Sequence, residues 1–265
     1  MIMCMFKIIA VTDWGLYQEF HGCTGLDAYV EYLAGLVVGV GTESGHRAVG
    51  MGSLQESGKA AGASAGGGGE SGKFIQPDFL ILREKNLPEQ AYMELLIKLL
   101  GKCRNFNGQG KRAGILAHTH LLAARQAGCN GIHLPFPLFE EYYAEQVQVP
   151  ERRSPDREYG SSQILRDCHG GISAIENIGV SVHSREEAEK AEAMGATYLT
   201  AGHIFPTSCK KGLPGRGLGF LEGLCASVSI PVYAIGGIHP ENLHQIRGAG
   251  AAGACMMSEY MKGSY

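Results

Sequence analysis

Residues 179–202, GVSVHSREEAEKAEAMGATYLTAG, contain the pattern that decides the fold. Two short, mostly apolar runs, 179–182 and 198–202, flank a segment of helical composition at 185–193. Near-continuous apolar runs of this length are typical of strands buried on both faces, as in parallel sheets. The stretch therefore predicts a strand, a helix and a second strand parallel to the first.

The same alternation extends in both directions along the chain. Further apolar runs occupy residues 6–12, 79–83, 114–118, 131–134, 232–235 and 253–257, and further helices are indicated at 26–37, 88–100, 119–127 and 241–248. Eight strands are the number that closes a barrel, and no G-x-G-x-x-G follows the first strand. We therefore predict an α/β fold, a (β/α)8 TIM barrel, with residues 1–265 forming a single domain.

Two segments depart from this alternation. Residues 39–74 are rich in Gly, Ser and Ala and predict a flexible insertion, with a mobile lid over a substrate as the alternative. Residues 145–175 carry a polar stretch and predict a surface insertion. Thirteen of the 39 glycines lie between Gly35 and Gly72, so the first insertion explains only part of the glycine excess.

The composition excludes several classes of partner. A formal net charge of −3 is unlike the basic surfaces that bind nucleic acid. The eight cysteines include no C-x-x-C pair, which indicates free thiols in a reducing compartment. The N-terminus has no cationic leader, and no apolar stretch approaches the roughly 20 residues that span a bilayer. The chain is therefore expected to be cytoplasmic, with neither nucleic acid nor membrane as a partner.

The residues that close each apolar run are the first candidates for chemistry, because barrels of this kind place their active sites where the strands end. Arg83 and Lys85 are two positions apart and point to the same side of an extended backbone. Two cations on one side could bind a phosphate, a diphosphate or a carboxylate. The alternative is that they are ordinary charged residues where the strand leads into a loop. His183 can act as a general acid or base near neutral pH, or it packs beside a helix cap formed by Ser184.

Two later segments predict an anion site. The long loop at 202–217 carries Thr207 and Lys210 among several glycines, and these side chains offer hydroxyl and cationic donors. Loops after the seventh and eighth strands of such barrels commonly bind phosphate through backbone N–H groups. The corresponding residues here are Gly236, Gly237, Met257 and Ser258.

The remaining histidines are weaker candidates for metal ligands. His118 and His120 share one face of the chain, but no third ligand is suggested by spacing, which favours a structural or substrate-contacting role. His133 lies inside an apolar run and is expected in the barrel interior.

Three stretches resemble the thiamine phosphate synthase and thiazole tautomerase (TenI) superfamily. They are ILREK at 81–85, GVSVHSREEAEKAEAMGATYLTAGHIFPTSCKKGLPGRGL at 179–218 and IPVYAIGGIHPENL at 230–243. With a looser likeness over 6–12 and 79–134, the resemblance covers about half the chain. It implies one of two activities. Synthases of this superfamily join an aminopyrimidine diphosphate to a thiazole phosphate with Mg²⁺, whereas tautomerases isomerise a thiazole carboxylate phosphate without metal.

The departures from the synthase pattern favour the tautomerase branch. Synthases have an Asn-Asp pair after the third strand and Gly-Gln-x-Asp after the fourth, and these carboxylates hold Mg²⁺ and the diphosphate. This chain has His118-Thr119, which also changes the floor of the pocket, and PFPL at 135–138. Mg²⁺ requires hard oxygen ligands, and none replaces them nearby. The sixth apolar run is followed by Gly202-His203, where synthases have Gly-Pro. The CKKGLPGRG stretch at 209–217 is similar to the corresponding loop of the tautomerases.

The resemblance also implies a role for each candidate residue. Arg83 or Lys85 would bind the carboxylate of the thiazole, and His183 would move the proton. The phosphate would lie against Gly236, Gly237, Met257 and Ser258. The expected substrate contacts are His118, His203, Thr207 and Lys210.

The sequence thus predicts a metal-independent thiazole tautomerase of thiamine biosynthesis or salvage, acting on a small phosphorylated thiazole. The alternatives are a Mg²⁺-dependent thiamine phosphate synthase and a non-catalytic module that binds or senses a phosphorylated ligand. Only seven residues follow Ser258, so the eighth helix is expected to be short. A partner subunit of a homo-oligomer, or the 145–175 insertion, would then cover the apolar strip left on the barrel wall.

Overall fold

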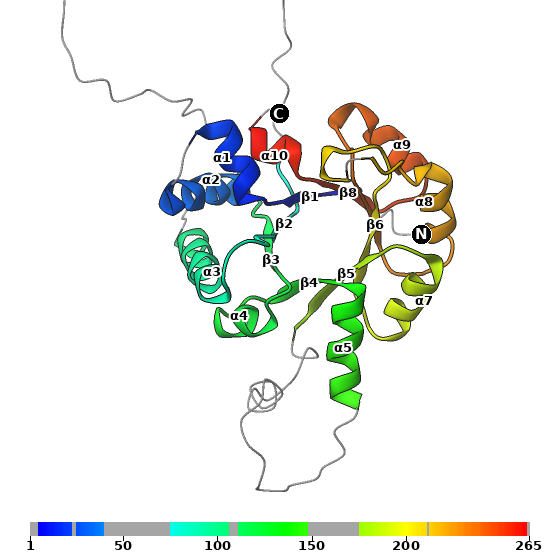
Figure 1. Cartoon of the computed structure of the whole chain (residues 1–265), viewed down its shortest axis with the longest axis horizontal. Coiled ribbons are helices and arrows are strands. Elements are labelled where there is room, and N and C mark those ends of the chain that lie inside the picture. Colours follow the sequence, from blue (N-terminus) through cyan, green and yellow to red (C-terminus); the bar gives the residue numbers. More distant parts are fainter. Residues whose placement is uncertain are drawn as a thin grey trace, which may run out of the picture.

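The chain folds as a closed barrel of eight parallel strands, as predicted. The computed structural model describes residues 5–22, 25–39, 75–105, 111–147, 175–210 and 212–263, without the side chains of 145–147. Neighbouring strands pair in chain order, and β8 pairs with β1 to close the barrel (Figure 1). The strands are β1 (Lys7–Val11), β2 (Phe79–Leu82), β3 (Gly114–His118), β4 (Gly131–Pro135), β5 (Asn177–Val182), β6 (Tyr198–Gly202), β7 (Val232–Ile235) and β8 (Gly253–Met256).

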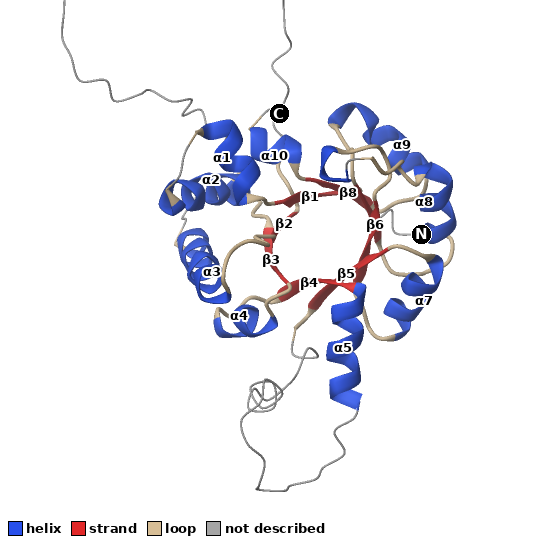
Figure 2. Cartoon of the chain, in the orientation of Figure 1, coloured by secondary structure: helices blue, strands red, loops and turns tan. Residues whose placement is uncertain are grey.

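Helices form a layer outside the barrel (Figure 2). In the described part of the chain they are α1 (Trp14–His21), α2 (Leu26–Val38), α3 (Glu89–Arg104), α4 (Leu121–Gln126), α5 (Phe136–Val147), α7 (Arg185–Ala193), α8 (Gly217–Cys225), α9 (Leu243–Gly248) and α10 (Ser258–Lys262), with 3₁₀ turns η2 (Ser208–Lys210) and η3 (Pro240–Asn242). None of the helices in the ranges above is long and apolar enough to cross a membrane.

The predicted strands agree closely with the observed ones. Three of them, β3, β6 and β7, have the predicted bounds, and the other five differ by one or two residues at an end. The helix predicted at 185–193 coincides with α7, where the Ser184 side chain accepts a hydrogen bond from the Glu187 N–H at 3.1 Å. Three helices, α1, α5 and α8, were not identified in the sequence.

The two predicted insertions lie mostly outside the described residues. Gly39 ends α2, and residues 40–74 are not described. The predicted start of the second insertion, at residue 145, was wrong, because residues 145–147 belong to α5. Residues 148–174 are also outside the described part, so the interpretations of both segments stay predictions.

The barrel interior is filled by a mixed layer of aliphatic and aromatic side chains. It contains Ile9, Val11, Ile81, Leu116, Tyr198, Tyr233 and Cys255. A Cβ atom on Gly179 would lie 1.9 Å from Cζ of Tyr198, so only glycine leaves room there for the tyrosine ring. Some glycines outside the 39–74 segment are therefore required by interior packing rather than by ligand binding, a cause that the sequence did not reveal.

The eighth helix is short, as expected, and it packs against a helix of the same chain that the sequence did not predict. Tyr260 and Met261 of α10 are 1% and 0% exposed, and α10 packs on α1 of the same chain. The His21 Nε2–H donates to the Met261 carbonyl at 3.0 Å, and the Tyr260 hydroxyl donates to the Ile75 carbonyl at 2.7 Å. Helix α1 thus covers part of this region, and further cover by a partner subunit or by the 145–175 insertion stays a prediction.

Removing the Met261 side chain tests this packing. Met261→Ala is expected to lower the free energy of unfolding by about 3 kcal/mol, because it leaves a cavity beside Tyr29, whose hydroxyl lies 3.8 Å from the Met261 sulfur. Met5→Ala is the matched control, since Met5 is 82% exposed, and its effect should stay below about 0.5 kcal/mol. Urea denaturation measures both. Equal effects of the two substitutions would contradict the burial of the Met261 side chain in the core.

Candidate active site

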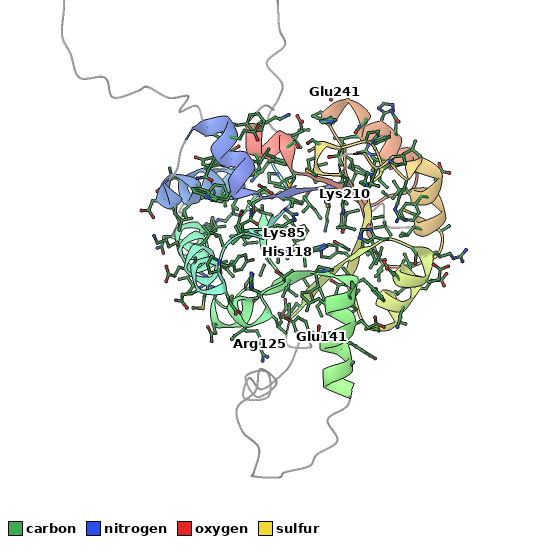
Figure 3. The ribbon with its side chains drawn as sticks, in the orientation of Figure 1. Lys85, His118, Arg125, Glu141, Lys210 and Glu241 are labelled. Atoms are coloured by element: carbon green, nitrogen blue, oxygen red, sulfur yellow. The ribbon has the colours of Figure 1, made fainter. Side chains whose placement is uncertain are left out.

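A cavity of about 430 Å³ opens at the mouth of the barrel, where the carboxyl ends of the strands converge. Its size is in the range of small-molecule sites. Figure 3 shows Lys85 and His118 over the middle of the barrel, with Lys210 nearby. All eleven residues predicted from the sequence line this one cavity: Arg83, Lys85, His118, His183, His203, Thr207, Lys210, Gly236, Gly237, Met257 and Ser258. Their functional roles remain predictions.

Arg83 and Lys85 are held on the cavity side by the residue between them. Glu84 is 4% exposed, and its carboxylate accepts hydrogen bonds from the Thr12 hydroxyl at 2.5 Å and the Tyr29 hydroxyl at 2.6 Å. The other carboxylate oxygen accepts the Trp14 N–H at 2.7 Å. These bonds fasten the end of β2 to the region just after β1, so the two cations flanking Glu84 face the cavity. This role of Glu84 was not predicted from the sequence. An acidic residue between two cations at the end of a strand could have indicated it.

The environment of these groups is strongly cationic. The positive charge of Arg83, burial and Lys210 all lower the pKa of the Lys85 ammonium, in that order. Asp13 contacts Arg83 at 3.2 Å, but the cavity lining in the described ranges includes no aspartate or glutamate. An anionic ligand would relieve this repulsion, so the electrostatics favour phosphate and carboxylate groups.

His183 directly follows β5, and its ring is oriented by the backbone. The Nδ1–H donates to the Gly202 carbonyl at 3.2 Å, because a carbonyl can only accept. In the neutral ring, that bond assigns the proton to Nδ1, so Nε2 is the nitrogen that could act as a base. The His183 carbonyl accepts a hydrogen bond from the Arg216 guanidinium. Arg216, from the long loop after β6, thus ties this loop to the end of β5.

The long loop after β6 closes one side of the cavity. Thr207 and Lys210, just before and at the end of the short turn η2, line the cavity. The Cys209 N–H donates to the Thr207 hydroxyl at 3.4 Å. His203 also lines the cavity, and its Nε2–H donates to the Leu213 carbonyl at 3.4 Å. Lys211 lies outside the described residues.

Gly236 and Gly237 form the turn after β7 that was predicted to hold a phosphate. Gly236 has φ +99°, and a Cβ atom there would lie 2.4 Å from Cβ of His203. A Cβ atom on Gly237 would lie 2.5 Å from the Pro206 carbonyl oxygen. The two glycines therefore permit close packing of the β7 turn against the loop after β6, and this packing shapes the cavity wall between them.

Several cavity residues were missed in the sequence. They are Ser181 and Thr200 within β5 and β6, His239 after β7 and Lys262 on α10. Lys262 follows Ser258 by four positions on one helix, a spacing that places both on the same face and could have revealed it. To predict Ser181 and Thr200, one must know which strand positions point into the barrel, and the apolar pattern alone does not give that.

His118 and His133 form a stacked pair beneath the cavity, with ring centroids 5.9 Å apart. His133 is in the barrel interior, as predicted, where it contacts the Tyr198 hydroxyl at 3.0 Å through Nδ1 and the Ser181 hydroxyl at 2.7 Å through Nε2. His120 lies elsewhere, packed against Tyr92 with ring centroids 4.4 Å apart, and does not line the cavity. Nowhere in the described ranges do three or more His, Cys, Asp or Glu side chains gather as a metal site.

Comparison with known proteins identifies the family. The chain is 46% identical over 184 residues to the "Thiamine-phosphate synthase" of Syntrophomonas wolfei, a match that covers 69% of this chain and 74% of that protein. The chain belongs to the thiamine monophosphate synthase family. The sequence profile described as Thiamine monophosphate synthase matches residues 171–260, from before β5 into α10.

The chain is also similar to a second named relative and, in its fold, to a solved structure. The "Thiamine-phosphate synthase" of Pyrococcus abyssi is 46% identical over 87 residues, covering 33% of this chain and 42% of that protein. The solved structure of a thiamine phosphate pyrophosphorylase from Pyrococcus furiosus has the same fold, with a TM-score of 0.55 and 22% identity over 97% of this chain and 88% of that one. The family resemblance predicted from the sequence is confirmed.

Gly236 offers a test of the cavity wall. Gly236→Ala is expected to weaken inorganic phosphate binding at least about tenfold, because the added Cβ must displace His203 or the turn itself. Gly195→Ala is a matched control, since Gly195 has a similar φ of +95° but a Cβ atom added there would meet nothing within 4 Å.

Both substitutions strain the backbone by a similar amount, so their difference isolates the contact with His203. Isothermal titration calorimetry measures phosphate affinity, and thermal melts report the shared loss of stability. Unchanged phosphate affinity in Gly236→Ala would contradict a phosphate site at this turn.

Proposed function

We propose that this protein isomerises a thiazole carboxylate phosphate in thiamine biosynthesis or salvage, with His183 as the proton-transfer residue and no metal. The observation that carries the proposal is the composition of the cavity. It combines a histidine whose Nε2 is free to accept a proton with Arg83, Lys85 and Lys210, and its described lining has no carboxylate. Such a site suits a substrate with two anionic groups.

The substrate is expected to span the cavity. Its phosphate would bind at the turn after β7 and the start of α10, near Gly237 and Ser258, where backbone N–H groups favour an anion. Its carboxylate would pair with Arg83 or Lys85 on the β2 side. His183, at the end of β5, would then lie against the ring between the two anionic ends.

The reaction moves one proton between two carbon atoms of the substrate. Nε2 of His183 would take the proton from the first carbon, and the electron pair left behind would be delocalised toward the carboxylate. The imidazolium formed would then give the same proton to the second carbon, so that no atom is gained or lost. A single histidine reached by both carbons can perform both transfers near neutral pH.

The residues present do not fit the Mg²⁺ of a synthase. The strands that carry the metal carboxylates in synthases end here in His118 and Pro135. The nearest acids have other partners, since Asp13 pairs with Arg83 and Glu84 is bonded to three donors around β1. Mg²⁺ prefers oxygen ligands, and the cationic cavity described above repels it.

Thiamine phosphate synthase is the second candidate. The names of the relatives favour it, because the proteins from Syntrophomonas wolfei and Pyrococcus abyssi are both thiamine-phosphate synthases by name. Lys210 and Thr207 would hold a diphosphate in that reaction. A non-catalytic protein that binds the same phosphorylated ring is the third candidate.

His183→Asn is the decisive substitution for the proposal. It is expected to reduce the rate of proton exchange at the thiazole ring by at least about 100-fold, because asparagine cannot accept the proton. Affinity for the thiazole carboxylate phosphate should change less than about threefold. NMR in D₂O measures the exchange, and His244→Asn, on α9 outside the cavity, is the control.

The wild-type protein separates the three candidates. It is incubated with thiazole carboxylate phosphate alone, and again with the aminopyrimidine diphosphate and Mg²⁺. Isomerisation without metal supports the proposal. Thiamine phosphate formation only with Mg²⁺ selects the synthase, and saturable binding without turnover selects the binding protein; either result overturns the proposal.

A further inference from the structure

His118 occupies a position in the cavity that the proposed proton transfer does not use. It ends β3, is 7% exposed and lines the cavity floor (Figure 3). Its ring stacks on His133, but neither of its ring nitrogens has a hydrogen-bond partner in the described part of the chain. The side chain lines the cavity, so a ligand there can contact the ring. A neutral imidazole carries one donor and one acceptor, and neither is used within the described part of the chain.

The neighbouring His133 cannot take this role. Its two ring nitrogens contact the Tyr198 hydroxyl and the Ser181 hydroxyl, so its hydrogen-bonding capacity is filled within the barrel. It does not line the cavity. His133 acts instead as a fixed platform on which the His118 ring rests.

The backbone also holds His118 in place. Its N–H donates to the Tyr92 hydroxyl at 2.7 Å, and its carbonyl accepts from the Thr119 hydroxyl and from the His120 N–H, both at 2.7 Å. Thr119 has φ +62°, in the left-handed region that β-branched residues rarely adopt. Strained residues of this kind are typical of sites where a neighbouring side chain must be held in one orientation.

We infer that His118 is a second catalytic residue, whose ring N–H donates a hydrogen bond to the negative charge that develops on the substrate when His183 removes a proton. This inference rests on the proposed function. The proton removed from carbon goes to Nε2 of His183, while His118 keeps its own proton and transfers none. A donor fixed before the reaction stabilises developing charge without reorganisation, which is how oxyanion sites act.

The charge state of His118 suits a donor and excludes a competing base. Burial, the His133 ring and the charges of Arg83 and Lys85 lower the pKa of His118 to about 2. The imidazole is therefore neutral throughout the neutral range, and a neutral imidazole carries one N–H group. Neutral histidines serve as hydrogen-bond donors to developing negative charge in other barrel enzymes.

Substitution of His118 by side chains without a donor tests the inference. His118→Phe keeps the stacking on His133 but removes the N–H, and His118→Leu removes it with a different shape. Each is expected to lower kcat for isomerisation about 100-fold, with KM changed less than about threefold, because the bond is made to charge that develops only in the reaction. His118→Asn, which restores an N–H donor, should recover kcat to within about tenfold of wild type.

The controls separate this inference from the proposed function. His244→Leu tests the loss of a histidine outside the cavity, and thermal melts identify any variant that does not fold. The pH profile of kcat should keep the same shape in His118→Asn as in the wild type, since the proton acceptor of the proposed reaction is unchanged. Wild-type kcat in His118→Phe or His118→Leu would overturn only the role of His118. An inactive wild-type protein would overturn the proposed function and this inference together.

Discussion

The pairing of β8 with β1 is the interaction on which the site depends. It joins Lys7 to Gly253 and Ala10 to Met256, and it brings the end of the chain against its beginning. A Cβ atom on Gly253 would lie 2.0 Å from the Lys7 carbonyl oxygen, so the seam closes only with glycine at this position. Once the barrel is closed, all eight parallel strands deliver their carboxyl ends to one mouth.

Closure of the barrel explains why the residues at the strand ends could be predicted from the sequence to form a single site. Residues 83, 118, 183, 203, 236 and 258 are far apart in the chain but each follows or ends a strand. In a closed parallel barrel, a position at the carboxyl end of a strand is sufficient to bring these residues together. They can therefore be predicted as neighbours without knowledge of any individual contact. The apolar runs located the strands well because their residues are buried on both faces and are therefore apolar almost without interruption.

The parts that could not be predicted depend on tertiary packing. Helix α1 has only eight residues, and it is stabilised by Tyr17 and Trp14 packing on Tyr29 and by its cap at Asp13. Such a helix has little intrinsic stability of its own. The inward hydroxyls of Ser181 and Thr200 depend on strand register, and the network of Glu84 joins residues some 70 positions apart. Local sequence carries no signal for either.

In the proposed isomerase, the floor and the rim of the cavity have separate tasks. His118 and Pro135 stand where the family resemblance places the metal carboxylates of synthases, so the floor is neutral, while Arg83 and Lys85 form a cationic rim. A rim of this kind binds anionic groups whether or not a metal is present, but only an acidic floor can hold Mg²⁺ against the charge of the rim. Relatives that are synthases by name share much of the sequence with this chain, and this likeness accounts for its fold. Under the proposed function, a difference in chemistry from those relatives would rest on the few floor residues, because these would decide whether charge that develops on the substrate meets a metal ion or an imidazole N–H.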